Sequence, residues 1–223
     1  GVVKLASGDP TWRHLTALTV HYETQPLPTW IGWYLHQLPA WFQKASCLLM
    51  FAVEIIVPFF IFGPKKFRLI ACTAFVSFQV LIMVTGNYCF FNLLAIALSV
   101  LLVDDDTWNC VWKWNVSFSK IENPFNVLGK WVVGWVALIY VLISTVEIVG
   151  AFRLRLSWLA PVAVLYAFAS PFRTINGYGL FAVMTAKRPE IVIEGSNNGM
   201  DWYAYEFKWK PGDLKKKPHF VAP

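Results

Sequence analysis

The chain has 223 residues, of which 57% are hydrophobic and only 14% are charged, and its formal net charge is +6. Soluble domains carry about 25% charged residues, and the mean hydropathy of this chain is +0.51. The composition therefore excludes an ordinary soluble domain and predicts a membrane protein, with a water-facing tail after Pro171, where basic residues are enriched.

The four cysteines form no CxxC pair and no metal-binding spacing, so we predict no metal site and no cofactor. The sequence begins GVVKLASG, which has neither the charged start nor the apolar core of a signal peptide. It stops at HFVAP. We interpret it as a fragment of a longer chain.

The first 44 residues predict two helices at the membrane surface. Asp9 and Pro10 are typical of an N-cap and a first helical position. Residues 30–38 place aromatic and aliphatic side chains at helical spacing, as in a helix that lies in the interface. The segment HYETQPLP (residues 21–28) would join the two helices as a loop.

The sequence predicts five membrane helices. A span needs about 20 apolar residues, and the apolar segments are 46–62, 69–86, 88–103, 131–150 and 156–172. Together they predict a mainly α-helical polytopic membrane protein.

The length of the apolar segment 69–103 is the reason for predicting two helices within it. These 35 residues carry no charge, and a single helix of about 52 Å would exceed a hydrocarbon core of about 30 Å. TGNYCFFN (residues 85–92) supplies the bend, where we expect Asn87 and Asn92 to bond backbone groups that lipid leaves open.

After the last span the apolar pattern changes to period two. Residues 190–196 and 201–209 flank an Asn-Gly turn and predict a β-hairpin. We therefore divide the chain into surface helices with the HYETQPLP loop (1–44), a transmembrane domain (45–172) and the start of a β-rich C-terminal region (173–223).

The sidedness of the chain rests on weaker signals. Asn115 begins a glycosylation sequon, which is used only in the lumen. Two predicted spans separate it from the tail, so the tail would also be luminal. The basic KKFR (residues 65–68) fits the positive-inside rule only if 69–103 crosses once. One and two crossings both remain open.

Four segments of the sequence carry a resemblance to a known family. In chain order they are SGDPTWRHLTALTVHYETQPLPTW, TGNYCFFNLL, DDD, and NGYGLFAVMTAKRPEIVIEGSNNGMDWYAYEFKWKPGD. They resemble the lipase maturation factor family over most of the chain, and more nearly the second of its two vertebrate paralogues. The resemblance implies a multi-pass endoplasmic reticulum protein, without enzymatic activity, that assists folding, assembly and maturation of secreted dimeric lipases. The loop 104–127 is shorter than in some relatives.

Two groups of polar residues are the candidate sites. HYETQPLP has the chemistry of a recognition loop, with a histidine that titrates near neutrality, or of a structural connector. Glu54 and Glu147 lie within spans, where a charge costs about 2.5–3.5 kcal/mol, so each needs a partner or a polar cavity. Pro58 would distort the helix beside Glu54. We expect Gln79, Asn87, Asn92 or His21 as its partner.

The candidate binding residues for client or lipid are His21, Tyr22, Glu23, Gln25, Glu54, Asn87, Asn92 and Glu147. The expected partners are secreted lipases, by resemblance, and membrane lipids. A tail joined to a membrane span argues against nucleic acid. The alternative hypothesis is a membrane enzyme or lipid-handling protein, because the family is distantly similar to vitamin K-dependent carboxylase. That hypothesis predicts an essential Glu54 in a pocket.

Overall fold

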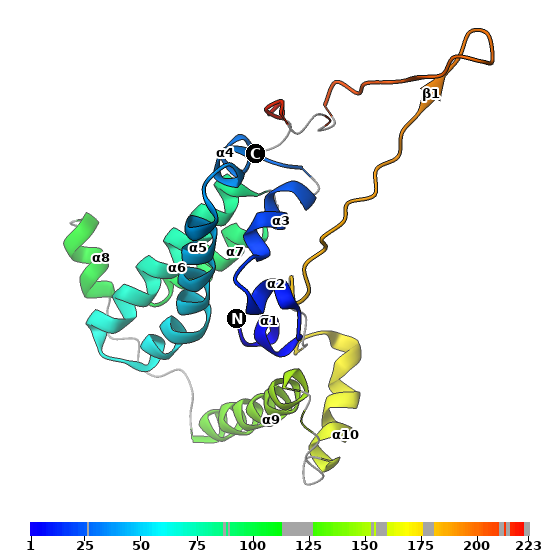
Figure 1. Cartoon of the computed structure of the whole chain (residues 1–223). Helices are drawn as coiled ribbons and strands as arrows, with labels where there is room; N and C mark the ends of the chain where they lie inside the picture. Colours follow the sequence, from blue (N-terminus) through cyan, green and yellow to red (C-terminus); the bar gives the residue numbers. More distant parts are fainter. Residues whose placement is uncertain are drawn as a thin grey trace.

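The computed structural model describes residues 1–25, 27–86, 88, 90–112, 127–152, 154, 160–175, 181–209, 212 and 215–220. Helices form the body of the molecule, and the tail leaves it as an extended arm (Figure 1). The predicted class, a mainly helical membrane protein with a C-terminal hairpin, is confirmed.

Four short helices form an N-terminal layer: α1 (Val2–Ala6), α2 (Pro10–Arg13), α3 (Ala17–Thr24) and α4 (Trp30–His36). The predicted N-cap is confirmed, because the Asp9 carboxylate accepts the Thr11 N–H at 2.7 Å. Leu15 has a positive φ of 59°, which separates α2 from α3. The prediction of a loop at HYETQPLP is wrong for its first four residues, which form the end of α3.

The first membrane helix changes its hydrogen-bonding pattern halfway. It begins as α5 (Ala40–Phe51), continues as the π-helix η1 (Ala52–Ile56) and ends as the 3₁₀-helix η2 (Val57–Phe62). Pro58 has no N–H to donate to the carbonyl of Glu54, so the α-helical ladder cannot continue through this turn. The whole segment Ala40–Phe62 is long and apolar enough to span a membrane.

The next two helices form an antiparallel hairpin. α6 (Lys65–Thr85) is a second candidate span, and α7 (Phe91–Val100) packs against it. Lys65 Nζ lies 3.0 Å from Asp104 Oδ2, so the chain returns after α7 to the end at which α6 began. This favours two crossings, with KKFR in the first turn of α6 rather than in a loop.

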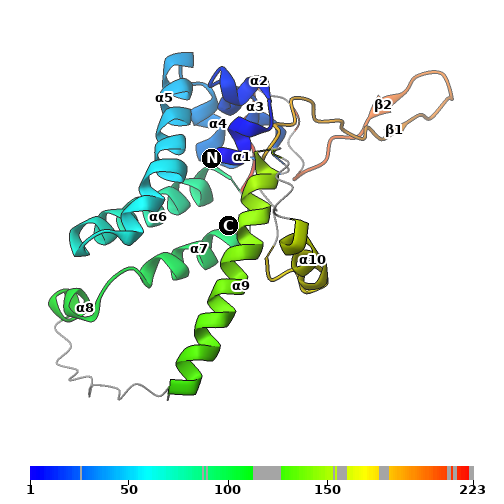
Figure 2. The same ribbon diagram turned by 90° about the horizontal axis from the view of Figure 1, so that it is seen from below.

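The ends of α6 define two faces of the molecule, since 21 residues of helix extend about 31 Å. We call the face at the start of α6 the Lys65 face and the face at its end the Gln25 face. The short helix α8 (Asp105–Trp112) follows Asp104, and both views place it far from the arm (Figures 1 and 2).

The third candidate span is α9 (Val127–Ala151), of which residues 129–150 form the apolar segment. It contacts α1 and α10 (Ala160–Ala169), and α10 continues into the 3₁₀ turn η4 (Ser170–Phe172). Within the described ranges, three helices are therefore long enough to cross a membrane, and α7 and α10 with η4 are shorter apolar helices.

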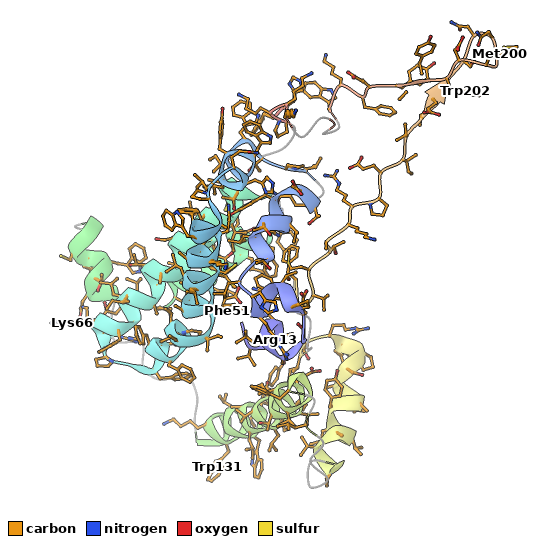
Figure 3. The ribbon with its side chains drawn as sticks, viewed as in Figure 1. Arg13, Phe51, Lys66, Trp131, Met200 and Trp202 are labelled. Atoms are coloured by element: carbon orange, nitrogen blue, oxygen red, sulfur yellow. The ribbon has the colours of Figure 1, made fainter. Side chains whose placement is uncertain are left out.

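The arm ends in the predicted hairpin. β1 (Glu194–Gly195) and β2 (Tyr203–Ala204) pair antiparallel, so the paired part is shorter than predicted. At the turn, the Asn198 carbonyl accepts the N–H groups of Met200 and Asp201, each at 2.9 Å. Figure 3 shows Met200 at the tip of the arm, well away from the helices.

The core lies where the N-terminal layer meets α5. Trp12 packs edge-on against Phe51 at 5.9 Å, and Ala17, Cys47 and Met184 complete the buried cluster. Figure 3 shows Phe51 on the side of α5 that faces α2. Because Met184 comes from the tail, the core joins the two ends of the chain.

Candidate functional site

The segment after α3 donates hydrogen bonds to the last carbonyl groups of α6. The last carbonyls of a helix have no partner within the helix. Here the Gln25 side-chain amide donates to the Thr85 carbonyl at 3.0 Å, and the Thr29 hydroxyl donates to the Val84 carbonyl at 2.8 Å. A Cβ on Gly32 would lie 2.6 Å from the Thr85 oxygen, so only glycine lets α4 approach α6 this closely.

Aromatic rings cover the bend between α6 and α7. His21 Nε2 and the Tyr88 hydroxyl lie 3.0 Å apart, and the Phe181 ring packs against both residues at 5.1 and 5.4 Å. Burial lowers the pKa of His21 from its ordinary 6.5 to about 4, and the positive charge of Lys4 adds to the shift. The expectation that His21 titrates near neutrality is therefore wrong, because it is a neutral hydrogen-bonding group there.

The start of the tail binds α2. The Trp12 indole N–H donates to the Phe181 carbonyl at 3.0 Å, and the Met184 N–H donates to Asp9 at 2.6 Å. Burial alone would raise the pKa of Asp9, but the hydrogen bonds from Met184 and Thr11 outweigh it and hold the pKa below its usual value. Asp9 therefore caps α2 and holds the tail at the same time.

Arg188 binds the end of α3. Its guanidinium donates to the carbonyl of Gln25 at 3.1 Å and to that of Glu23 at 3.4 Å. The Glu23 carboxylate lies 2.8 Å from His36 Nε2, which links α3 to α4. A cation at the C-terminus of a helix also complements the helix dipole.

Three separate parts of the chain thus meet between α2 and the end of α6. We call this meeting point the junction, and its residues are Asp9, Trp12, His21, Gln25, Thr29, Thr85, Tyr88, Phe181, Met184 and Arg188. Of the predicted site residues, His21 and Gln25 belong to the junction, and Tyr22 and Glu23 lie between them in α3. Tyr22 and Gln25 are only 7% and 3% exposed, so this segment positions the tail and the bend.

Glu54 has a partner that the sequence did not reveal. Lys4 Nζ lies 2.5 Å from Glu54 Oε1 and 5.2 Å from the centre of the Trp12 ring. The main-chain nitrogen of Gly1 contacts the same carboxylate. Of the expected partners, Gln79 and Asn92 bond each other and His21 bonds Tyr88, whereas Asn87 lies outside the described residues. The pocket around Glu54 stays a prediction.

Asn92 joins the α6–α7 hairpin rather than the bend. Its amide donates to the Gln79 side chain at 2.7 Å, and the residue is almost completely buried. The predicted role of Asn92 at open backbone groups is therefore wrong. Asn87, the other asparagine of this prediction, lies outside the described residues.

Glu147 joins α9 to α10. Its carboxylate forms a hydrogen bond with the Tyr166 side chain, which comes from the neighbouring short helix. The remaining candidate, Asn115, falls outside the residues that the structure describes. In the described part of the chain, no three or more His, Cys, Asp or Glu residues are grouped to hold a metal ion.

Spanning helices, a surface layer and a tail held between them define this chain as a polytopic helical membrane protein. The family profile for the "Lipase maturation factor transmembrane domain" matches residues 1–110. The profile for the "Lipase maturation factor C-terminal domain" matches residues 174–223. The chain therefore belongs to the lipase maturation factor family.

Curated relatives match the whole chain. Over an alignment 317 positions long it is 31% identical to Lipase maturation factor 2 of Gallus gallus, and it is 30% identical to that of Homo sapiens. Lipase maturation factor 1 of Bos taurus is 32% identical over 238. The chain spans 44%, 45% and 42% of these relatives. No solved structure matches it.

Proposed function

We propose that this chain is part of a non-enzymatic factor of the endoplasmic reticulum membrane. It assists the folding, assembly and maturation of secreted dimeric lipases, which are its client proteins. The observation that carries the proposal is membership of the lipase maturation factor family along both the membrane part and the tail. The junction supports it, since its side chains are engaged in holding segments together rather than left free for chemistry.

The arm offers the surface for a client. Side chains alternate along a strand, so the register of Gly195 opposite Tyr203 places Tyr203, Tyr205 and Ile193 on one face of the hairpin. The arm exposes further apolar side chains, Ile191, Val192, Trp202, Phe207 and Trp209. Exposed apolar patches mark protein interaction sites. In this proposal HYETQPLP holds the start of the arm in place through its contact with Arg188, and the hairpin contacts the client.

We assign the Gln25 face to the lumen and the Lys65 face to the cytosol. The assignment follows the positive-inside rule, because Lys65, Lys66 and Arg68 lie together at the start of α6. The tail contacts the junction and is then luminal. Only two residues lie between the end of α8 at Trp112 and Asn115, too few to cross a membrane. Asn115 would then be cytosolic, so a luminal tail and a glycosylated Asn115 exclude each other.

The client proposal is tested by rescue. Cells without maturation factors would express the full-length parent of this chain together with a secreted dimeric lipase, and active lipase in the medium would be measured. We expect wild-type rescue and its loss in a Tyr203→Ser and Tyr205→Ser variant at equal expression. Lys208→Ser, an exposed position of the arm beyond the end of β2, is the control. Absence of rescue by the wild type would contradict the proposal.

Sidedness is tested by glycosylation. Met200→Thr creates a new sequon that begins at Asn198, at the exposed hairpin tip. We expect an endoglycosidase-sensitive mobility shift in this variant and none in the wild type. A shift in the wild type that Asn115→Gln removes would reverse the assignment of the two faces.

A further inference from the structure

The start of α4 lies at the level of a membrane boundary. Thr29 donates to the Val84 carbonyl at 2.8 Å, within the last turn of a candidate span. Trp30 follows Thr29 directly and begins α4. It is 44% exposed. Tryptophan is enriched at such boundaries because its ring is apolar and its N–H is polar.

An exposed apolar stripe continues from α4 into the first span. Ile31 and Tyr34 of α4, Leu38 in the connection and Trp41 at the start of α5 are all exposed, Trp41 to 68%. Farther along, Leu48, Leu49, Ile56 and Phe59 are exposed on the candidate span Ala40–Phe62. Because the stripe is continuous with a lipid-facing surface, lipid also covers the outer side of α4.

The tail returns to this boundary with positive charge. Lys217 Nζ lies 4.6 Å from the centre of the Trp30 ring, and Phe220 packs edge-on against the same ring at 5.9 Å. Lys215, Lys216 and Lys217 are all exposed. Among the described residues, neither Lys216 nor Lys217 forms an ion pair with a carboxylate. Their charge therefore remains available at the membrane surface.

We propose that Trp30, Lys216 and Lys217 form a binding site for the phosphate headgroups of anionic phospholipids in the surrounding bilayer. The aromatic ring enters the interface, and the ammonium groups above it contact the phosphates. Each lysine near an anionic surface contributes enough attraction for about a fivefold change in binding. Binding of a phospholipid headgroup at this site holds residues 215–220, where the arm returns to α4, against the membrane.

The test is backbone hydrogen exchange of the full chain in lipid nanodiscs, either neutral phosphatidylcholine or the same lipid with added phosphatidylserine. We expect residues 27–38 and 215–220 to exchange more slowly in the anionic discs, by about fivefold for each lysine in contact. The double variant Lys216→Gln and Lys217→Gln should lose that difference. Unchanged exchange in α6 shows that the variant is folded.

Two controls make the result specific. Lys208 lies 5.2 Å from the Trp209 ring, which repeats the lysine–tryptophan pair out on the arm. Lys208→Gln should keep the full lipid effect. Equal exchange in neutral and anionic discs, or an equal loss in Lys208→Gln, would overturn the proposal. So would the same slowing produced by inorganic phosphate in neutral discs, which would mean binding of a free anion.

Discussion

The ion pair between Lys4 and Glu54 predicts a measurable coupling. Removing one partner of a buried ion pair costs about 3–5 kcal/mol, because the other charge remains buried without compensation. The two side chains are 12% and 22% exposed. Partial access to solvent reduces the cost, so we expect about 2–4 kcal/mol for Lys4→Met or Glu54→Leu alone. The double variant should lie within about 1 kcal/mol of the wild type.

Thermal unfolding of the detergent-solubilised protein measures this prediction. For a chain of this size, 1 kcal/mol corresponds to about 2–4 °C, so each single variant should lower Tm by about 5–15 °C. The double variant should recover most of that loss. Additive losses in the double variant would refute the ion pair as the reason for these charges. Glu54→Gln with normal stability but no lipase rescue would instead favour an acid–base role.

Three further predictions concern the junction. The folded chain protonates His21 only below about pH 4, against 6.5 ordinarily, so unfolding takes up a proton between these values. Stability should therefore fall as pH drops through this window, by up to about 1.4 kcal/mol per unit, and less in His21→Gln. Gly32→Ala, with its Cβ 2.6 Å from the Thr85 oxygen, should lower unfolding free energy by about 1–3 kcal/mol. Gly134→Ala, with nothing within 4 Å, should not lower it. Arg188→Ala should speed hydrogen exchange at residues 181–190, and Arg188→Lys should do so less; equal exchange in all three proteins would contradict the contact.

Local pattern was sufficient for the long apolar helices, the start of α2 and the hairpin turn. Hydropathy located the spans because lipid requires about 20 apolar residues in succession. The Asn-Gly dipeptide located the hairpin because Gly199 adopts a positive φ of 71°. Asp9 and Pro10 located the start of α2 for similarly local reasons.

Partners distant in the sequence were beyond prediction. Lys4 and Glu54 are 50 residues apart, and His21 and Tyr88 are 67 apart. Hydropathy and spacing describe neighbours along one helix, whereas these pairs depend on how helices are placed against each other. The prediction that His21 titrates near neutrality was wrong for the same reason, because the burial that lowers its pKa depends on how the junction is packed. A lone lysine in the apolar start of the chain was the signal that could have indicated Lys4.

The contact between Asp9 and Met184 also sets the order of events during synthesis. The two residues are 175 positions apart, and ribosomes add about 5–20 residues per second. About 10–35 s therefore pass between the synthesis of Asp9 and Trp12 and the synthesis of the tail residues that cover them. During that interval the Asp9 carboxylate and the Trp12 indole lack the contacts that the tail will provide. Closure of the junction is thus a late step of biogenesis, because it cannot occur before the helices between residues 9 and 184 have been made.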